Sequence, residues 1–160
     1  HEHLYESDDL ANLRFNHYVD EMASLVTNTF GLDNGEIELN VESDDFDLNI
    51  NQAIPTALIL NELITNAYEH AFTEENGGTL NITMGENSKT MKLIVEDNGE
   101  GLPEDFDIET ATSLGMTLIN RLTRQLDGEL EIERRDAGGS RFTLTFQKSR
   151  KSGSGSNYFT

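Results

Sequence analysis

The sequence predicts an α+β fold, a two-layer sandwich in which strands and helices form separate layers. Apolar residues recur at helical spacing in three stretches of the chain and alternate at strand spacing in about six others. These stretches are grouped rather than strictly alternating, which disfavours a doubly wound parallel sheet. A chain of 160 residues is long enough to enclose one proper core, so we expect one such domain.

The expected elements, in chain order, are a helix at 10–30, strands at 37–41 and 46–50, a helix at 54–72, strands at 80–85 and 91–96, a helix at 115–126, and strands at 130–134 and 141–146. The first helix has an approximate apolar stripe made of Leu10, Leu13, Tyr18, Met22, Leu25 and Val26. Pro55 suits the first turn of the second helix, and Asp127-Gly128 ends the third.

The second helix carries a polar stripe on an otherwise apolar cylinder. Glu62, Asn66 and His70 recur every four residues, with Glu69 beside them. An unpaired buried polar group costs on the order of 1–3 kcal/mol, so a buried stripe must be satisfied by something. The alternative is a helix whose polar edge simply faces water.

A second polar motif, Asp97-Asn98-Gly99-Glu100-Gly101, ends the strand at 91–96. Asn-Gly between strands is a hairpin signal, but no matching strand follows, and the next element is a helix opened by Ser113-Leu114-Gly115. A carboxylate at the end of a strand, in a mostly apolar pocket, can accept a hydrogen bond from a bound ligand. The alternative is an aspartate that caps a turn.

These motifs, in this order and spacing, resemble the nucleotide-binding boxes of the GHKL superfamily of gyrase, Hsp90, histidine kinases and MutL. The matching residues are Glu62-x-x-x-Asn66 for the N box, Asp97-x-Gly99-x-Gly101 for the G1 box and Ser113-Leu114-Gly115 for a shortened G2 box. Gly138-Gly139-Ser140-Arg141-Phe142 resembles the terminal strand element that closes the adenine pocket. The resemblance implies the Bergerat fold, in which a mixed sheet packs against about three helices.

Within the superfamily, the chain most resembles sensor histidine kinases whose dimerisation helices are of the second HisKA type. The segment His1–Ser7 resembles the end of the second dimerisation helix of that group. We therefore expect residues 1–8 to end a dimerisation helix, residues 9–147 to form the catalytic ATP-binding domain, and residues 148–160 to form a flexible polar tail.

The resemblance also implies roles for the residues of the boxes. Asp97 selects adenine, Gly99 and Gly101 allow backbone and base to approach closely, and Ser140 joins Asp97 through its hydroxyl or a water.

At the phosphate end, the resemblance assigns Asn66 as an amide-oxygen ligand of Mg²⁺, and Gly115 as the place where a helix start approaches phosphate. Glu62 is the expected catalytic residue. The glutamate at this position is the general base for water in the resembling ATPases. In the resembling kinases it assists metal binding or the accepting histidine. Both Glu62 and Asn66 would also suit an ordinary helix surface.

Glu69 departs from the resembling kinases, which often have a lysine three residues after the N-box asparagine. A glutamate has the wrong sign for contact with phosphate, and this puts ATP affinity in doubt unless His70, Arg121 or Arg124 supplies the charge. His70 is equally suited to contact phosphate or to be a buried structural histidine.

Composition excludes several other functions. Eleven basic and thirty acidic residues give a formal charge of −19, which argues against binding to nucleic acid or anionic membranes. No cysteine is present, so disulfides and thiolate metal sites are excluded. No apolar run approaches the roughly 20 residues of a membrane span, and we expect an excised soluble domain of cytoplasmic location.

The function that the resemblance implies is that of the catalytic domain of a two-component sensor histidine kinase. With ATP and Mg²⁺ as cofactors, it would transfer the γ-phosphoryl group to a histidine of a dimerisation domain that this chain lacks. A homodimer of the full-length protein and a response regulator are the expected partners. The alternatives are an anti-sigma-type serine kinase and a nucleotide-sensing module without turnover.

Overall fold

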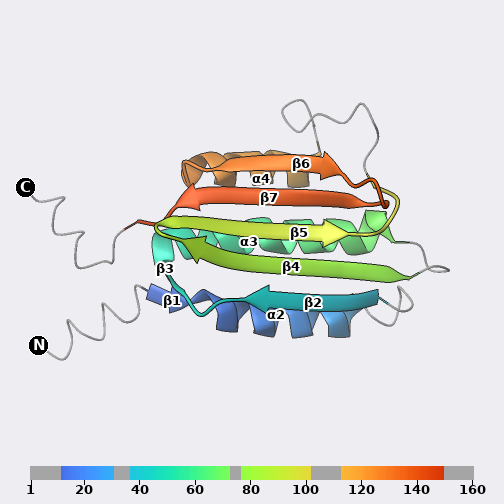
Figure 1. Cartoon of the computed structure of the whole chain (residues 1–160), viewed down its shortest axis with the longest axis horizontal. Coiled ribbons are helices and arrows are strands. Elements are labelled where there is room, and N and C mark those ends of the chain that lie inside the picture. Colours follow the sequence, from blue (N-terminus) through green and yellow to red (C-terminus); the bar gives the residue numbers. More distant parts are fainter. Residues whose placement is uncertain (1–11, 31–36, 73–76, 102–112, 150–160) are drawn as a thin grey trace, which may run out of the picture.

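A computed structural model describes residues 12–30, 37–72, 77–101 and 113–149 of the chain. In chain order its elements are β1 (Asn12–Arg14), α2 (Phe15–Phe30), β2 (Ile37–Ser43), β3 (Asp47–Asn49), α3 (Ile50–Asn66), the π-helical turn η1 (Ala67–Ala71), β4 (Gly78–Asn87), β5 (Thr90–Asp97), α4 (Leu114–Gln125), β6 (Glu129–Arg134) and β7 (Ser140–Gln147). One sheet forms the first layer, and α2, α3 and α4 cover one of its faces (Figure 1). This arrangement confirms the predicted two-layer α+β class.

The main sheet has five strands in the order β2-β4-β5-β7-β6. The β2–β4 pair is parallel and the other three pairs are antiparallel, so the sheet is mixed. The central strand β5 pairs with β4 on one side and with β7 on the other, and Glu96 lies opposite Arg141. Because side chains alternate across a strand, Asp97 lies on the same buried face as Leu93 and Val95. A carboxylate is thereby carried to the helix-covered side of the sheet.

The N-terminal helix begins later than predicted. Residues 12–14 form the short strand β1, which pairs with β3 and places Leu13 opposite Leu48, and α2 starts only at Phe15. The buried stripe of α2 is Phe15, Val19, Met22 and Val26, whereas Tyr18 and Leu25 are exposed. Leu10 lies outside the described residues.

The strands predicted at 37–41 and 46–50 do not pair with each other. β2 joins the edge of the main sheet beside β4, while β3 pairs with β1 and ends before Ile50, which opens α3. Two hydrogen bonds tie the connecting segment to α2 instead: Phe15 N–H donates to the Phe46 carbonyl (3.3 Å), and Asn16 Nδ2 donates to Asp45 Oδ1 (2.9 Å).

Helix α3 starts about one turn before the predicted position at Ile54. The side chain of Asn49 accepts a hydrogen bond from Asn51 N–H (2.9 Å) and so caps the helix, which places Pro55 inside it. After Asn66 the helix widens into η1, and single π-helical turns of this kind often occur at functional sites.

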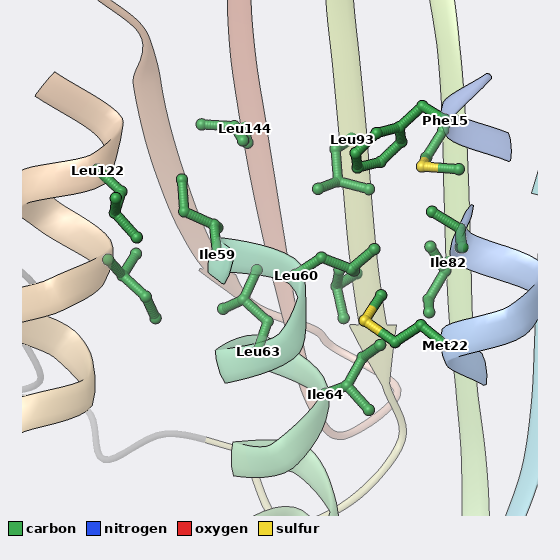
Figure 2. Close-up of a cluster of buried hydrophobic side chains, with 14 of the residues drawn as sticks. Phe15, Met22, Ile59, Leu60, Leu63, Ile64, Ile82, Leu93, Leu122 and Leu144 are labelled. Carbon is green, nitrogen blue, oxygen red and sulfur yellow. The ribbon is translucent and has the colours of Figure 1, made fainter. Parts of the chain in front are cut away.

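Helix α3 lies at the centre of the core. In Figure 2, Ile59, Leu60, Leu63 and Ile64 of α3 lie between Leu122 of α4 and the α2 residues Phe15 and Met22, and they face Ile82, Leu93 and Leu144 of the sheet. All ten side chains are buried, and burying one side chain of this size contributes about 1.5–3 kcal/mol. The core therefore fixes the position of the helix that carries the polar stripe.

The described C-terminal end contacts the domain. Lys148 forms an ion pair with Glu86 (2.5 Å), and Ser149 N–H donates to Gln52 Oε1 (2.9 Å). The rest of the expected tail and the expected helix end at 1–8 lie outside the described residues. No helix in the described ranges combines the length and the hydropathy that a membrane span requires.

Candidate functional site

A cleft of about 500 Å³ opens between the helix layer and one end of the central strands. It is lined by Glu62, Leu63, Asn66, Ala67, Glu69, His70, Val95, Asp97, Gly101, Ser113, Gly115, Met116, Ser140 and Phe142. All predicted site residues except Gly99 belong to this lining. A larger hollow on the outer face of the sheet, of about 1100 Å³, contains none of them.

Asp97 is the buried carboxylate of the cleft. It is 6% exposed, and its Oδ1 accepts a hydrogen bond from Gly99 N–H (2.9 Å). Gly99 therefore supports the carboxylate of Asp97 without lining the cleft. The backbone N–H of Ser140 donates to the same carboxylate. Burial raises the pKa of Asp97 above its ordinary value, and the two N–H groups and the positive charge of Arg135 offset part of that rise. A carboxylate has about four lone-pair sites, so acceptor capacity remains for a ligand.

The walls beside Asp97 are apolar. Leu63 and Ala67 come from the helical side, Val95 from β5, Met116 from α4 and Phe142 from β7. A flat ring that presents an amino group to Asp97 would be enclosed by these side chains. The arrangement suits an apolar heterocycle with a polar edge, which is the kind of ligand that such pockets bind.

Gly139 provides a close approach of two backbones behind Asp97. Its φ is +93°, and a Cβ at this position would lie 1.9 Å from the carbonyl oxygen of Asp97. Gly101 lies close to Gly139 and has φ of +80°. A Cβ at Gly101 would lie 3.2 Å from the carbonyl oxygen of Gly139. Only glycine fits the first contact, because a side chain there would collide with the backbone that carries the carboxylate.

The predicted polar stripe faces the cleft. Glu62 and Asn66 are half-buried on α3, whereas Glu69 and His70 on η1 are exposed. His70 Nε2 lies 3.7 Å from Glu69 Oε2. The alternative interpretation of His70 as a buried structural histidine is therefore wrong, and this side chain is accessible to a ligand.

The start of α4 closes the same side of the cleft. Ser113 caps the helix, since its Oγ accepts a hydrogen bond from Met116 N–H (3.2 Å). A Cβ at Gly115 would lie 2.9 Å from Glu62 Oε2, so the N-box carboxylate lies against the first turn of α4. Residues 102–112, which connect the G1 and G2 motifs, lie outside the described residues.

The charge of the cleft is unfavourable to a bare anion. Glu62 and Glu69 line it together with Asp97, and the described lining contains no lysine or arginine. Arg121 and Arg124, two of the three residues that could supply a compensating charge, are exposed on α4 and are not part of this lining. Within the described ranges, no group of three or more His, Cys, Asp or Glu side chains is placed to hold a metal alone. The oxygen donors Asn66 and Glu62 suit Mg²⁺ when ligand phosphates and water complete its coordination.

Sequence reasoning missed the support of the Asp97 turn. Asn98 Oδ1 accepts from Thr79 N–H (2.7 Å), and Arg135 donates to the carbonyl oxygen of Asp97 (2.8 Å). Neither contact has a local signature, because the partners are 19 and 38 residues apart in the sequence.

The comparisons with known proteins agree with this geometry. The family described as histidine kinase-, DNA gyrase B- and HSP90-like ATPase matches residues 51–150. The blue-light-activated histidine kinase 2 of Erythrobacter litoralis is 31% identical over 122 residues, which are 76% of this chain and 35% of that protein. The sensor histidine kinase PdtaS of Mycobacterium tuberculosis is 30% identical over 132 residues, 81% of this chain and 25% of that protein. The chain thus spans about a third or less of the length of these relatives.

Solved structures show the same fold. The histidine kinase domain of the Erythrobacter litoralis EL346 blue-light-activated kinase superimposes with a TM-score of 0.78 at 27% identity, covering 89% of this chain and 71% of that one. The catalytic domain of the histidine kinase ThkA has a TM-score of 0.72 at 20% identity and covers 86% of this chain and 95% of that one, a likeness of fold alone.

Proposed function

The chain belongs to the family of histidine kinase-, DNA gyrase B- and HSP90-like ATPases and has the fold of a histidine kinase catalytic domain, and on this premise we propose that it binds Mg·ATP and transfers the γ-phosphoryl group to a histidine of a dimerisation domain. The observation that carries the proposal is the position of Asp97. It is a buried carboxylate at the end of an apolar cleft whose other end is lined by Glu62, Asn66 and the start of α4.

Adenine occupies the apolar end in this proposal. Its amino group donates to Asp97, while its faces contact Met116 and Phe142. Guanine is rejected, because its carbonyl oxygen would face the carboxylate and leave a buried acceptor unpaired. Ser140 is 3% exposed and lines the cleft with Asp97, and in this proposal it hydrogen-bonds the same edge of the base.

The phosphates extend toward α3 and the first turn of α4. Asn66 would offer an amide oxygen to Mg²⁺, and the bound ion would supply the positive charge that the cleft lacks. The backbone at Gly115 lies where an anion meets the N-terminal end of a helix. Glu62 lies beside both and is assigned to the reacting end, where it orients the acceptor or the metal.

Transfer requires an acceptor from outside the cleft. An acceptor imidazole nitrogen would form a bond to the γ-phosphorus while the bond from that phosphorus to the bridging oxygen breaks and ADP leaves. We assign the acceptor to a dimerisation domain of the full-length protein, a homodimer that passes the phosphoryl group to a response regulator. Because ATP is its substrate, we place the domain in the cytoplasm.

Incubation with γ-labelled Mg·ATP tests this function. The isolated domain should bind ATP without labelling itself, because in-line geometry needs the acceptor helix. A dimerisation-domain fragment of the full-length protein, added in trans, should become labelled slowly, and the label should be lost in acid and retained in base. An acid-stable label would support the serine kinase instead, and binding without any transfer would support a nucleotide-sensing module.

Glu69 offers a test of where the phosphates lie. Glu69→Lys should tighten ATP binding about three- to tenfold, because it replaces a repelling charge at the phosphate end with an attracting one. The gain is modest because the Glu69 side chain is 50% exposed and solvent screens its charge. Calorimetry at constant ionic strength measures the affinity.

The matched control is Glu131→Lys on β6. Glu131 is exposed on the outer face of the sheet, so this variant makes the same change in net charge away from the cleft. It should leave affinity within about twofold of wild type, since solvent and salt screen an exposed charge that lies outside the cleft. Equal effects of the two variants would show that Glu69 acts only through the overall charge.

A further inference from the structure

The turn between β6 and β7 reaches over the end of β5, and we propose that Arg135 in this turn is a positioning residue that holds Asp97 in the orientation needed to receive the base. The inference rests on the proposed binding of ATP, in which Asp97 contacts adenine. Arg135 itself is not among the residues that line the cleft. It would act only through the backbone of Asp97 and through its own positive charge.

The guanidinium of Arg135 contacts two consecutive residues of β5. One terminal nitrogen donates to the carbonyl oxygen of Asp97 (2.8 Å), and Nε lies 3.3 Å from Glu96 Oε2. The Arg135 side chain is only 26% exposed, so solvent screens these contacts less than on an open surface. Contacts to adjacent residues, whose side chains lie on opposite faces of the strand, restrict rotation of the backbone between them.

The turn that carries Arg135 is itself closed. Arg135 N–H donates to the carbonyl oxygen of Gly139 (2.9 Å), and Gly138 N–H donates to that of Arg135 (3.0 Å). The same turn presents Gly139 to the carbonyl of Asp97 and the Ser140 N–H to its carboxylate. The end of β5 is therefore held by backbone on one side and by a charged side chain on the other.

Arg141 provides a natural comparison within the same cluster. Its guanidinium binds Glu96 Oε2 at 2.8 Å and also lies 3.6 Å from Glu133 on β6. Arg141 therefore shares the Glu96 partner with Arg135, but no described contact joins it to Asp97. Removing Arg141 should disturb the ion pairs on the outer face of the sheet without releasing the Asp97 carbonyl.

Arg135 also supplies the cation that faces Asp97. Among the described residues, the other titratable side chains near the carboxylate are Glu96 beside it on β5, Glu62 on α3, and Glu69 with His70 on η1. The cleft-lining residues of α4 and β7 carry no charge. A protonated Asp97 would lose the charge that makes it a strong acceptor, so ATP binding should weaken as the pH falls through its pKa. Without Arg135 that pKa rises, and the midpoint of binding should move to higher pH.

The experiment compares Arg135→Met with Arg141→Met. Calorimetry with Mg·ATP is run from about pH 3.5, just below the ordinary pKa of an aspartate, to about pH 8. Each variant is measured below the temperature at which circular dichroism shows it to unfold. Arg135→Met should lower affinity about tenfold and move the pH midpoint upward, because a charge-assisted hydrogen bond and a nearby cation are lost. Arg141→Met should stay within about twofold of wild type, with an unchanged midpoint, since its contact to Glu96 is half exposed and of small energy.

Arg135→Lys separates position from charge and remains informative if Arg135→Met does not fold. A lysine keeps the cation but cannot make the two directed contacts, so the midpoint should stay while affinity falls by about threefold. The inference is overturned if both methionine variants lose affinity equally with no movement of the midpoint, or if the Arg135 variants bind as wild type. A wild-type domain that binds no ATP at any pH would instead overturn the proposed function together with the inference.

Discussion

Asp97→Asn should weaken ATP binding by about 1.5–3 kcal/mol, or roughly 10- to 150-fold, because the charge-assisted acceptor of the adenine amino group is lost. The structure makes this replacement more than a loss of charge. The carboxylate already accepts backbone N–H groups from Gly99 and Ser140, and the amide nitrogen of an asparagine cannot accept from either. The new side chain would have to satisfy those donors with its one oxygen.

Competition between ATP and GTP in a fluorescent-analogue assay measures both affinity and base selectivity. Asp136→Asn is the matched control, since Asp136 is exposed in the β6–β7 turn close to the cleft but is not part of its lining. The control should bind as wild type. If Asp97→Asn bound ATP with unchanged affinity, adenine could not lie against this residue.

Gly139→Ala should lower the free energy of unfolding by about 2–4 kcal/mol, because a methyl group would have to fit 1.9 Å from the Asp97 carbonyl oxygen in a backbone conformation with φ of +93°. The obstacle is backbone rather than a flexible side chain, so relief requires β5 and the β6–β7 turn to separate. ATP affinity should fall together with stability, since the same movement displaces Asp97.

Gly138→Ala separates the clash from the backbone strain. Gly138 has φ of +102°, but the nearest atom to its ideal Cβ is the Gly99 carbonyl oxygen at 3.9 Å. Its cost should therefore be limited to strain, about 1 kcal/mol. Urea denaturation followed by circular dichroism compares the two variants, and equal destabilisation by both would show that close packing against Asp97 contributes nothing.

The sequence by itself determined the elements that carry the site. The strand that ends at Asp97, the apolar helix with Glu62 and Asn66, and the helix opened by Ser113 were all predicted within a few residues of their bounds. Their signals are local. Alternation along the strand places Asp97 on the buried face, the four-residue spacing of Glu62 and Asn66 places both on one face of a helix, and a capping serine starts α4. Such signals act over one or two turns of chain and can be read without knowing the topology.

Only the tertiary structure decided the start of α2 and the support behind Asp97. Residues 12–14 form a strand because β3, more than thirty positions later, pairs with them. The helical pattern that begins near Leu10 gives no indication of this pairing. Arg135 likewise reaches the Asp97 carbonyl only because β6 and β7 follow β5 across the sheet and bring their turn over its end. Strand pairing and ion pairs between distant residues depend on which strands become neighbours, and no local spacing encodes that order.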